Sequence, residues 1–464
     1  MRTLVQLILL SLLLVSCTVF KSRETRSARK IRHEVAHSAV FSNGFTGFTL
    51  MDPGTGKTLA DFNGNRYFLP ASNTKIFTLA TCLKVLGDSV PGLKATTFKD
   101  GTETINYLKP TGDPTFLHPY FKDWQPVYQF LVNLSGPATL DFNNFNDTRL
   151  GPGWAWDDYS EGYSAERSAM PIFGNVMTIQ KKDSSWALYP FNHLDKWGWN
   201  LMQEGTINDL PSYSNPLRSA ESNEIYIPSQ ENFTKGFSKD IPFRTAAFVI
   251  NDMLRDTIQK SNISTIRSFT KEEEIEEKER IPEDLKWRTL YSTPVDTVLR
   301  RMMHHSDNLI AEQMLLVCAG VKFNLLKQDT VINWMIDSTL TVLAQRPRWV
   351  DGSGLSRYNL MTPQSMAQVL LKLWQEQPHE RLLSLFPAGG VNGTIVDWYA
   401  GKAGKPYVFA KTGGMTGVQC LSGYVVCKSG KVLIFSFMHN NFVGSRRPWK
   451  TEMQRILELI HERF

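Results

Sequence analysis

The sequence predicts an α+β fold in which an antiparallel sheet, flanked by helices, is interrupted by a large β-rich insertion. The chain has 464 residues, of which 42% are hydrophobic, so it can build several cores and is not disordered as a whole. Segments with helix and strand periodicity lie toward both ends of the chain, whereas short strand-like runs fill the middle. No repeat of roughly 20–50 residues is apparent.

The chain begins with a segment typical of an export signal. Arg2 supplies a positive start, and the apolar run 4–15 is too short to span a bilayer comfortably. The run leads into Leu-Val-Ser-Cys, which resembles the lipobox of bacterial lipoproteins and ends at Cys17. We expect residues 1–17 to be a lipoprotein-type signal peptide, with lipidation of Cys17 tethering the protein to a membrane of the periplasm or cell envelope. Ordinary signal cleavage is the alternative.

Residues 25–87 and 291–464 are predicted to build one domain. Apolar residues at helical spacing, turn-rich junctions and β-branched runs mark its elements. These elements are, in chain order, a helix over 25–40, strands 47–50 and 57–62, helices over 72–86, 297–317, 329–344 and 363–375, strands 407–410, 418–427 and 431–439, and a helix over 446–464. Two early and three late strands with helices around them describe one sheet flanked by helices.

The segment 88–290 has a different texture. It contains many Asn, Gly and Pro residues, short strand-like runs, and aromatic residues such as Trp154 and Trp156. It is predicted to be inserted, β-rich material of one or more domains. Near its end lies the charge run 271–280, which we expect to be a solvated loop or an exposed helix rather than a binding site.

Charge and residue types argue against several classes of function. The net charge of +6 is small for this length and is not gathered into one basic tract, so no nucleic-acid partner is predicted. The adjacent His304 and His305 are interpreted as ordinary polar residues, and neither a metal site nor a cofactor is predicted. Cys82 and Cys318 fall in apolar helical stretches, where a buried thiol acts as a small hydrophobic group.

Ser72 and Lys75 stand three residues apart at the start of a predicted helix, so their side chains share one face. A serine hydroxyl is a weak nucleophile unless a base takes its proton, and a lysine can do so only where burial or positive charge favours its neutral form. Backbone N–H groups at a helix start also stabilise developing negative charge. Alone, Ser-x-x-Lys is a weak signal, because a capping serine followed by a lysine is common.

Two further motifs follow in order. Ser-Asp-Asn at 306–308 lies at a turn within helical sequence, and Lys-Thr-Gly at 411–413 lies on a predicted strand that enters a hairpin. Ser-x-x-Lys, Ser-x-Asn and Lys-Thr-Gly in this order are the signature of β-lactamases and penicillin-binding proteins. The sequence therefore resembles the penicillin-recognising serine hydrolases, and the resemblance implies a penicillin-binding/β-lactamase-like domain.

The spacing of the motifs narrows the resemblance. Ser72 and Ser306 are 234 positions apart, whereas compact β-lactamases keep these motifs much closer. A large insertion here is similar to that of the class C low-molecular-mass penicillin-binding proteins, the D-Ala-D-Ala carboxypeptidase/endopeptidase family. Further segments that match this family are 112–114, 151–158 and 351–357. The resemblance covers about residues 40 to 440.

The resemblance implies a role for each motif residue. Ser72 would attack the carbonyl between two D-alanines, with Lys75 as the general base. Ser306 would relay a proton toward the leaving amine, and Asn308 would position Lys75 and the substrate amide.

Lys411, together with Thr412 and Gly413, is implied to bind the terminal carboxylate of the substrate. The oxyanion hole would be formed by the backbone N–H groups of Ser72 and Gly414. Gly414 stands where the family often has threonine. It keeps the N–H group but lacks a side chain that could touch a substrate or antibiotic.

In family members, the insertion and a downstream arginine help to bind the free end of the peptidoglycan stem peptide. Carried over, the residues are Trp154, Asp157 and Arg357. A diaminopimelate end presents an ammonium and a carboxylate, which an aspartate and an arginine can pair separately. Simple packing of Trp154 under a loop is the alternative, and Asp157 is not distinguished from Asp158. Asp351 is interpreted as a structural residue of its turn.

The predicted function is that of a penicillin-sensitive serine D-Ala-D-Ala carboxypeptidase/endopeptidase. Peptidoglycan stem peptides would be its substrates, and β-lactam antibiotics its covalent inhibitors. A β-lactamase, an esterase on the same fold, and a catalytically silent peptidoglycan-binding lipoprotein are the alternatives. No segment matches the deacylating glutamate motif of a β-lactamase, and a silent homologue would have less reason to keep all three motifs intact.

Overall fold

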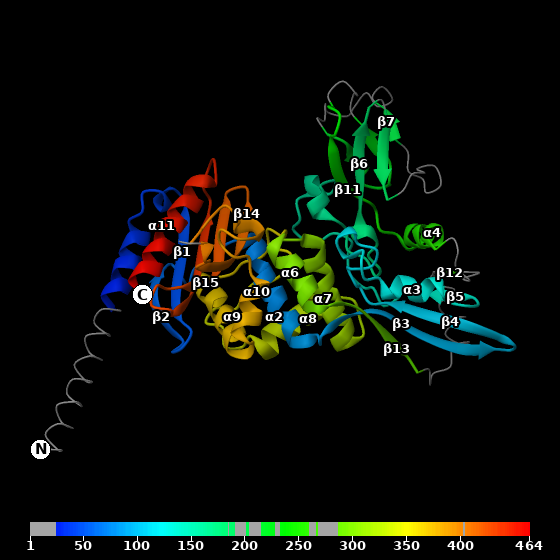
Figure 1. The fold of residues 1–464 in the computed structure, drawn as a ribbon, viewed down its shortest axis with the longest axis horizontal. Helices are drawn as coiled ribbons and strands as arrows, with labels where there is room; N and C mark the ends of the chain where they lie inside the picture. The colour runs from blue at the N-terminus through cyan, green and yellow to red at the C-terminus, as the bar shows by residue number, and fades with distance from the viewer. Residues whose placement is uncertain are drawn as a thin grey trace, which may run out of the picture.

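The computed structural model describes residues 25–183, 185–190, 201–203, 215–227, 233–258, 266–267, 286–401 and 404–464. The predicted signal peptide 1–17 with Cys17 and the charge run 271–280 lie outside the described residues. The predicted α+β class is confirmed: antiparallel sheets and helices are combined, and a β-rich insertion stands apart from the main sheet (Figure 1).

One five-stranded antiparallel sheet joins the two ends of the chain. Its strands are β1 (Phe45–Asp52), β2 (Lys57–Phe62), β14 (Val408–Met415), β15 (Val418–Val426) and β16 (Val432–Asn440), in the order β14-β15-β16-β1-β2. β1, near the start of the chain, pairs with β16, near its end, so that Thr49 lies opposite Ser436. β14, which carries the Lys-Thr-Gly motif, is an edge strand, so part of its backbone is free to face a substrate.

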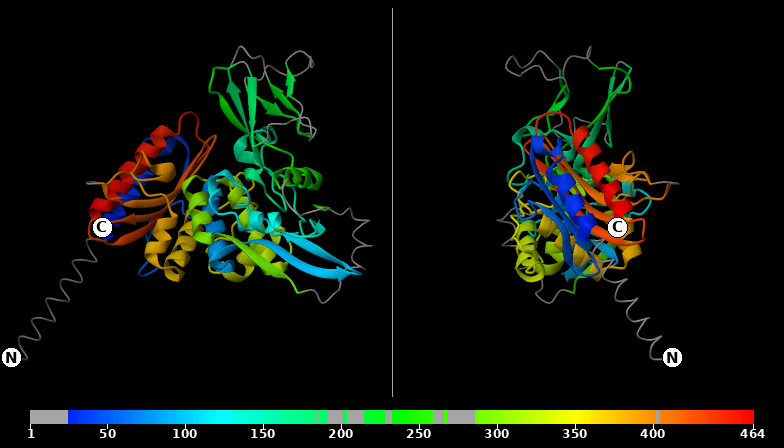
Figure 2. Two further views of the ribbon diagram at one scale, coloured as in Figure 1. Left: turned by 45° about the vertical axis from the view of Figure 1, so that its right-hand side comes forward. Right: turned by 90° about the vertical axis from the view of Figure 1, so that its left-hand side faces the viewer.

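Helices cover both faces of this sheet. A helix over residues 25–36 and α11 (Arg447–Arg463) lie on one face, as Figures 1 and 2 show. Successive side chains of β1 point to opposite faces of the sheet, so β1 contributes to a hydrophobic core on each face. Phe48 and Leu50 pack with the two terminal helices, whereas Met51 joins the core beneath the central helices.

The central helices lie between the sheet and the insertion. They are α2 (Lys75–Val85), α6 (Val295–His304), α7 (Asn308–Phe323), α8 (Gln328–Trp334), α9 (Pro363–Glu376) and α10 (His379–Leu385). α2 is buried among α6, α7 and α9, and its apolar residues lie in the largest core. Cys82 on α2 and Cys318 on α7 are both buried in that core as free thiols.

Several predicted helices have different boundaries. The helix predicted over 297–317 is two helices, α6 and α7, because residues 305–307 leave the helical path. The helix predicted from Ser72 begins with a 3-10 turn, Ala71–Thr74. The helix predicted over 329–344 ends as a π-helix at Met335–Thr339. In the first two cases the departure from α-helix occurs at a motif residue.

The described residues of the insertion form three sheets. One has the order β12-β5-β4-β3-β13, a second β11-β6-β7 and a third β8-β10-β9. The elements are β3 (Ser89–Asp100), β4 (Glu103–Pro110), α3 (Pro126–Val132), β5 (Ala138–Leu140), β6 (Val176–Lys182), β7 (Ser185–Tyr189), β8 (Leu201–Gln203), β9 (Leu217–Arg218), β10 (Ile225–Ile227), β11 (Ser238–Pro242), α4 (Ala247–Thr257), β12 (Ile266–Arg267) and β13 (Arg288–Pro294).

The chain leaves and re-enters the central helices through neighbouring strands. β3 follows α2, and β13 pairs antiparallel with β3 just before α6. The predicted boundary at residue 290 falls inside β13. The insertion has a core of its own, with apolar residues from β3, β4, α3 and α4. Among the described residues, no helix is both long and apolar enough to cross a membrane.

Candidate active site

Ser72 and Lys75 meet at the junction of the 3-10 turn and α2. Lys75 Nζ lies 3.1 Å from Ser72 Oγ, 2.6 Å from Asn308 Oδ1 and 2.7 Å from the carbonyl oxygen of Ser353. The lysine amine therefore donates to the hydroxyl of the first motif and to the amide of the second. These contacts hold Nζ within proton-transfer reach of Ser72.

Lys75 is fully buried, and the cost of desolvating its charge lowers its pKa from 10.5 to about 8. The negative charges of Glu312, Asp351 and Asp307 partly oppose this effect. The amine is therefore much closer to its neutral, basic form near neutral pH than an exposed lysine. This is the condition under which a lysine can take a proton from serine.

Ser306 and Lys411 are hydrogen-bonded to each other, and the charge of Lys75 acts on Lys411. Ser306 has a φ of 57°, a left-handed conformation that turns the chain between α6 and α7. Lys411 Nζ lies 2.9 Å from Ser306 Oγ and 2.8 Å from the carbonyl oxygen of Thr412. Burial lowers the pKa of Lys411 well below its usual range, and the nearby charge of Lys75 lowers it further.

β14 fits closely against the turn that carries Ser72. A Cβ built on Gly413 would overlap the carbonyl oxygen of Pro70 and crowd the backbone nitrogen of Asn73. Asn73 itself donates from Nδ2 to Ser422 Oγ on β15, at 2.8 Å. The glycine of the Lys-Thr-Gly motif is thus required for the approach of strand and turn.

A pocket of about 370 Å³ opens beside Ser72. Its lining residues are Ala71, Ser72, Ala155, Asp157, Asp158, Tyr163, Asn308, Gly354, Leu355, Arg357, Gly414, Met415 and Thr416. The pocket thus joins the Ser-x-x-Lys turn, the Ser-x-Asn helix start and the end of β14 to the insertion.

Two of the three predicted stem-peptide residues, Asp157 and Arg357, line this pocket, and Trp154 does not. Trp154 instead donates from its indole nitrogen to Asp351 Oδ2, at 2.9 Å. Asp158 accepts a 2.6 Å hydrogen bond from the Tyr163 hydroxyl. Within the described part of the chain, the carboxylate of Asp157 has no such partner.

Comparison with known proteins gives the chain a family. The model of the D-Ala-D-Ala carboxypeptidase 3 (S13) family matches residues 29–461, which is most of the chain. The chain belongs to this family. The predicted family and the predicted enzyme class, a serine D-Ala-D-Ala carboxypeptidase, are thereby confirmed.

Curated relatives match the S13 carboxypeptidase over most of its length. D-alanyl-D-alanine carboxypeptidase DacB of Haemophilus influenzae is 23% identical over 438 residues, covering 89% of this chain and 88% of the relative. The D-alanyl-D-alanine carboxypeptidase of Actinomadura sp. is 25% identical, covering 86% of this chain and 78% of the relative. A crystal structure of penicillin binding protein 4 from Haemophilus influenzae has the same fold, with a TM-score of 0.71, 19% identity and coverage of 90% and 97%.

Three residues at the S13 site were missed by the sequence analysis. Glu312 is fully buried on α7 and accepts a 2.7 Å hydrogen bond from the Ser353 nitrogen, next to the carbonyl that binds Lys75. Tyr163 accepts a 2.9 Å hydrogen bond from Asn308 Nδ2 through its backbone oxygen. The hydroxyl of Thr394 lies 2.8 Å from that of Thr412. For Glu312 a signal existed, since an acid in an otherwise apolar helical run is expected to have a buried partner.

Asp351 is an acceptor for its own turn, as predicted from the sequence. Its carboxylate accepts hydrogen bonds from the backbone nitrogens of Gly354 and Ser356 and from the side chains of Asn359 and Trp154. All of these distances are between 2.7 and 2.9 Å. The carboxylate is buried, so these bonds hold the loop that presents the Ser353 carbonyl to Lys75.

The sequence analysis overlooked one metal-type spacing, His-Glu-x-x-His from His33 to His37, which is typical of zinc proteases. The ring of His33, on the helix over 25–36, stacks on that of His37, just after the helix ends, with centroids 4.2 Å apart. Glu34 pairs instead with Arg455 at 2.9 Å. Within the described ranges, no group of three or more metal-ligating side chains is present.

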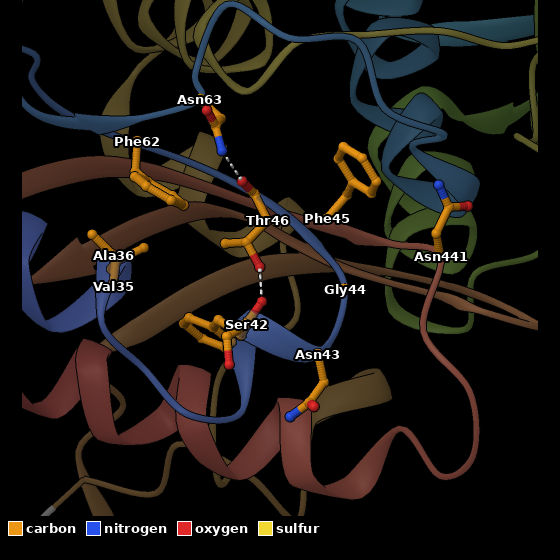
Figure 3. Close-up of a pocket in the computed structure, with 11 residues that line it drawn as sticks. Val35, Ala36, Ser42, Asn43, Gly44, Phe45, Thr46, Phe62, Asn63 and Asn441 are labelled. Carbon is orange, nitrogen blue, oxygen red and sulfur yellow. Dashed lines mark hydrogen bonds between the residues drawn. The ribbon is translucent and has the colours of Figure 1, made fainter.

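A second hollow, of about 590 Å³, lies at the start of β1 (Figure 3). Phe45, Phe62 and Asn63 line it together with Asn441, and Asn63 donates to the carbonyl oxygen of Thr46. None of the predicted site residues lines this hollow.

Proposed function

We propose that this carboxypeptidase acts through an acyl-enzyme at Ser72. The observation that carries the proposal is the position of Lys75 Nζ between Ser72 Oγ and Asn308 Oδ1, in a buried site that brings its pKa to about 8. Ser72 Oγ bonds to the carbonyl carbon of the penultimate D-alanine, and its proton passes to Lys75. The backbone N–H groups of Ser72 and Gly414 stabilise the oxyanion.

Collapse of the tetrahedral intermediate breaks the bond between the carbonyl carbon and the amide nitrogen. The leaving amine takes its proton from Ser306 Oγ, whose hydroxyl is resupplied through Lys411 or Lys75. Water then attacks the Ser72 ester, with Lys75 again as base, and releases the shortened peptide. The 2.9 Å contact between Lys411 and Ser306 supports this relay.

The carboxylate of the terminal D-alanine is proposed to bind near Lys411, Thr412 and Gly413. A carboxylate beside Lys411 favours the protonated amine and opposes the lowering of its pKa by burial. Substrate binding would therefore be accompanied by protonation of this lysine, which makes a free acid the preferred end group.

Peptidoglycan stem peptides are the proposed substrates, and β-lactams the proposed covalent inhibitors. The third residue of the stem would place its ammonium at Asp157 and its carboxylate at Arg357, which both line the pocket beside Ser72. Of the two neighbouring acids we favour Asp157, because the Tyr163 hydroxyl already occupies Asp158. Trp154 would act indirectly, through its hydrogen bond to Asp351.

Mass spectrometry after exposure to a penicillin tests this function. The wild-type protein should gain the mass of one antibiotic molecule, and Ser72→Ala should gain none. Ser429→Ala, which removes an exposed hydroxyl from a turn, is the control and should be acylated like the wild type. An unmodified wild type would overturn the proposal, and rapid loss of the adduct would favour a β-lactamase.

A location in the cell envelope and a lipid anchor at Cys17 are further parts of the proposal. The basis is the export-type segment 1–17 with its lipobox-like end. Membrane fractionation of cells that express the wild type and Cys17→Ala tests the anchor. The wild type should sediment with membranes and the variant should not; equal distribution would exclude lipidation.

A further inference from the structure

Gly414 has no side chain, and the guanidinium of another residue occupies the space where one would stand. A Cβ built on Gly414 would overlap Nη1 of Arg446, with Cζ of the same guanidinium at 3.2 Å. Arg446 precedes α11 and is distant from β14 in sequence. The guanidinium therefore lies directly against the backbone of the motif strand, in the space that a side chain at this position would fill.

This guanidinium lies on the side of β14 that carries hydroxyl groups. Thr412 and Gly414 are two residues apart on one strand, so their Cα–Cβ directions point to the same side. On that side, the hydroxyl of Thr412 lies 2.8 Å from that of Thr394. Gly414 also lines the pocket that contains Ser72. The guanidinium thus lies against Gly414, at the point where β14 borders the pocket beside Ser72.

The positive charge of Arg446 is not paired with an acidic side chain among the described residues. Its side chain is exposed, and within the part of the chain that the structure describes it forms no hydrogen bond or ion pair. An arginine cannot lose its proton under ordinary conditions, and its planar fork matches the two oxygens of a carboxylate. Lys411, a cation on β14 itself, is buried, and burial lowers its pKa. Arg446 is therefore the more dependable positive charge on this rim.

We propose that Arg446 is a specificity-determining residue that pairs with the substrate carboxylate next to the scissile amide. The inference rests on the proposed function, because that function places the leaving group at Thr412. The ligand class is any peptide whose leaving amine carries a carboxylate on the adjacent carbon. A terminal D-alanine meets this condition. A crosslinking residue also meets it when the amine released by cleavage has a carboxylate on its adjacent carbon.

A pair of peptides that differ only at the end group tests the proposal. Both are N-acylated tripeptides ending in D-Ala-D-Ala, one as the free acid and one as the carboxamide. The wild type should prefer the acid. Arg446→Gln should lower kcat/KM for the acid by about tenfold or more, with little change for the amide, since a hydrogen bond between two charged groups is stronger than one between neutral groups. Arg446→Lys should fall between the two, because it keeps the charge without the fork.

Two control variants separate a loss of carboxylate binding from a general disturbance of the structure. Arg447→Gln removes an adjacent exposed cation at the start of α11 and should leave the acid-to-amide ratio unchanged. The double variant Arg446→Gln with Gly414→Thr supplies a hydroxyl in the vacated space and should recover part of the preference for the acid. Equal losses for acid and amide in Arg446→Gln, or no loss, would overturn the inference.

The same experiment distinguishes this inference from the function on which it rests. A wild type that cleaves neither peptide and is not acylated by penicillin would refute both. A wild type that cleaves the acid, with an Arg446→Gln variant that keeps the same acid-to-amide ratio, would refute only the role of Arg446.

Discussion

Lys75 is buried, and within the described part of the chain its amine contacts no carboxylate directly. Its hydrogen-bond partners there are oxygens of Ser72, Asn308 and Ser353. Burial without a full counter-charge is what brings the pKa of its amine to about 8. Glu312 lies one hydrogen bond away, through the Ser353 peptide. The negative charge of Glu312 raises the pKa of Lys75 and so partly offsets the lowering caused by burial.

The pH dependence of acylation follows from this residue. Because the pKa of Lys75 is lowered from 10.5 to about 8, its neutral form grows as pH rises through 8. The rate of acylation by penicillin should therefore increase about tenfold per pH unit below this value and level off above it. Stopped-flow or quench measurements between pH 5.5 and about 9.5 would show the profile. A flat profile would exclude Lys75 as the base.

Glu312→Gln is the matched variant for that profile. The substitution removes a negative charge that raises the pKa of Lys75, so the midpoint of the profile should move to lower pH. A purely structural role for Glu312 would lower the rate at every pH and leave the midpoint in place. Thermal unfolding of the variant, measured alongside, separates the two effects.

At the scale of elements, the site depends on a close approach of β14 to the 3-10 turn before α2. The space at Gly413 is closed by the backbone of Pro70 and Asn73, and neither atom can move without shifting Ser72. The glycine of the Lys-Thr-Gly motif is therefore needed for close packing, while the lysine and threonine supply functional groups. The left-handed Ser306 has a comparable role, since it interrupts the helical path so that its hydroxyl faces Lys411.

Gly413→Ala tests the closeness of this approach. The added methyl group should push β14 from the turn, costing roughly 1–3 kcal/mol of stability and most of the acylation rate. Gly87→Ala is the control, because a Cβ there has no neighbour within 4 Å. Thermal unfolding and penicillin acylation report the two effects. If Gly413→Ala were acylated as fast as Gly87→Ala, the packing argument would be wrong.

At the scale of the whole molecule, α7 links the sheet side of the site to the insertion (Figure 2). Asn308 at its start binds Lys75 on one side and the Tyr163 backbone on the other. One turn further along, Gln313 is buried and bonds three backbone groups of the insertion. These are the oxygens of Gly112 and Ser168, both at 2.9 Å, and the Ser168 nitrogen at 3.0 Å.

Gln313→Ala should loosen the insertion from α7. The three backbone groups would be left unpaired in a buried place, at roughly 1–3 kcal/mol for each group that water cannot reach. We expect a lower unfolding midpoint and a larger loss of kcat/KM for stem peptides than of penicillin acylation, because only the peptide needs the insertion. Gln180→Ala, at an exposed strand position, should match the wild type. Equal losses for peptide and penicillin would contradict the assignment of stem binding to the insertion.

The sequence by itself determined the order of the elements, the antiparallel sheet built from both ends of the chain, and the three motifs. Each of these features follows from a local pattern of periodicity or spacing, and such patterns can be recognised in the sequence without a structure. Only the tertiary structure decided which other groups face those motifs: Glu312 beneath Lys75, Thr394 beside Thr412, and Arg446 over Gly414. Their partners come from remote segments, and sequence spacing carries no information about such contacts. For the same reason the structure, and not the resemblance, separated Asp157, which lines the pocket, from Trp154, which instead donates a hydrogen bond to Asp351.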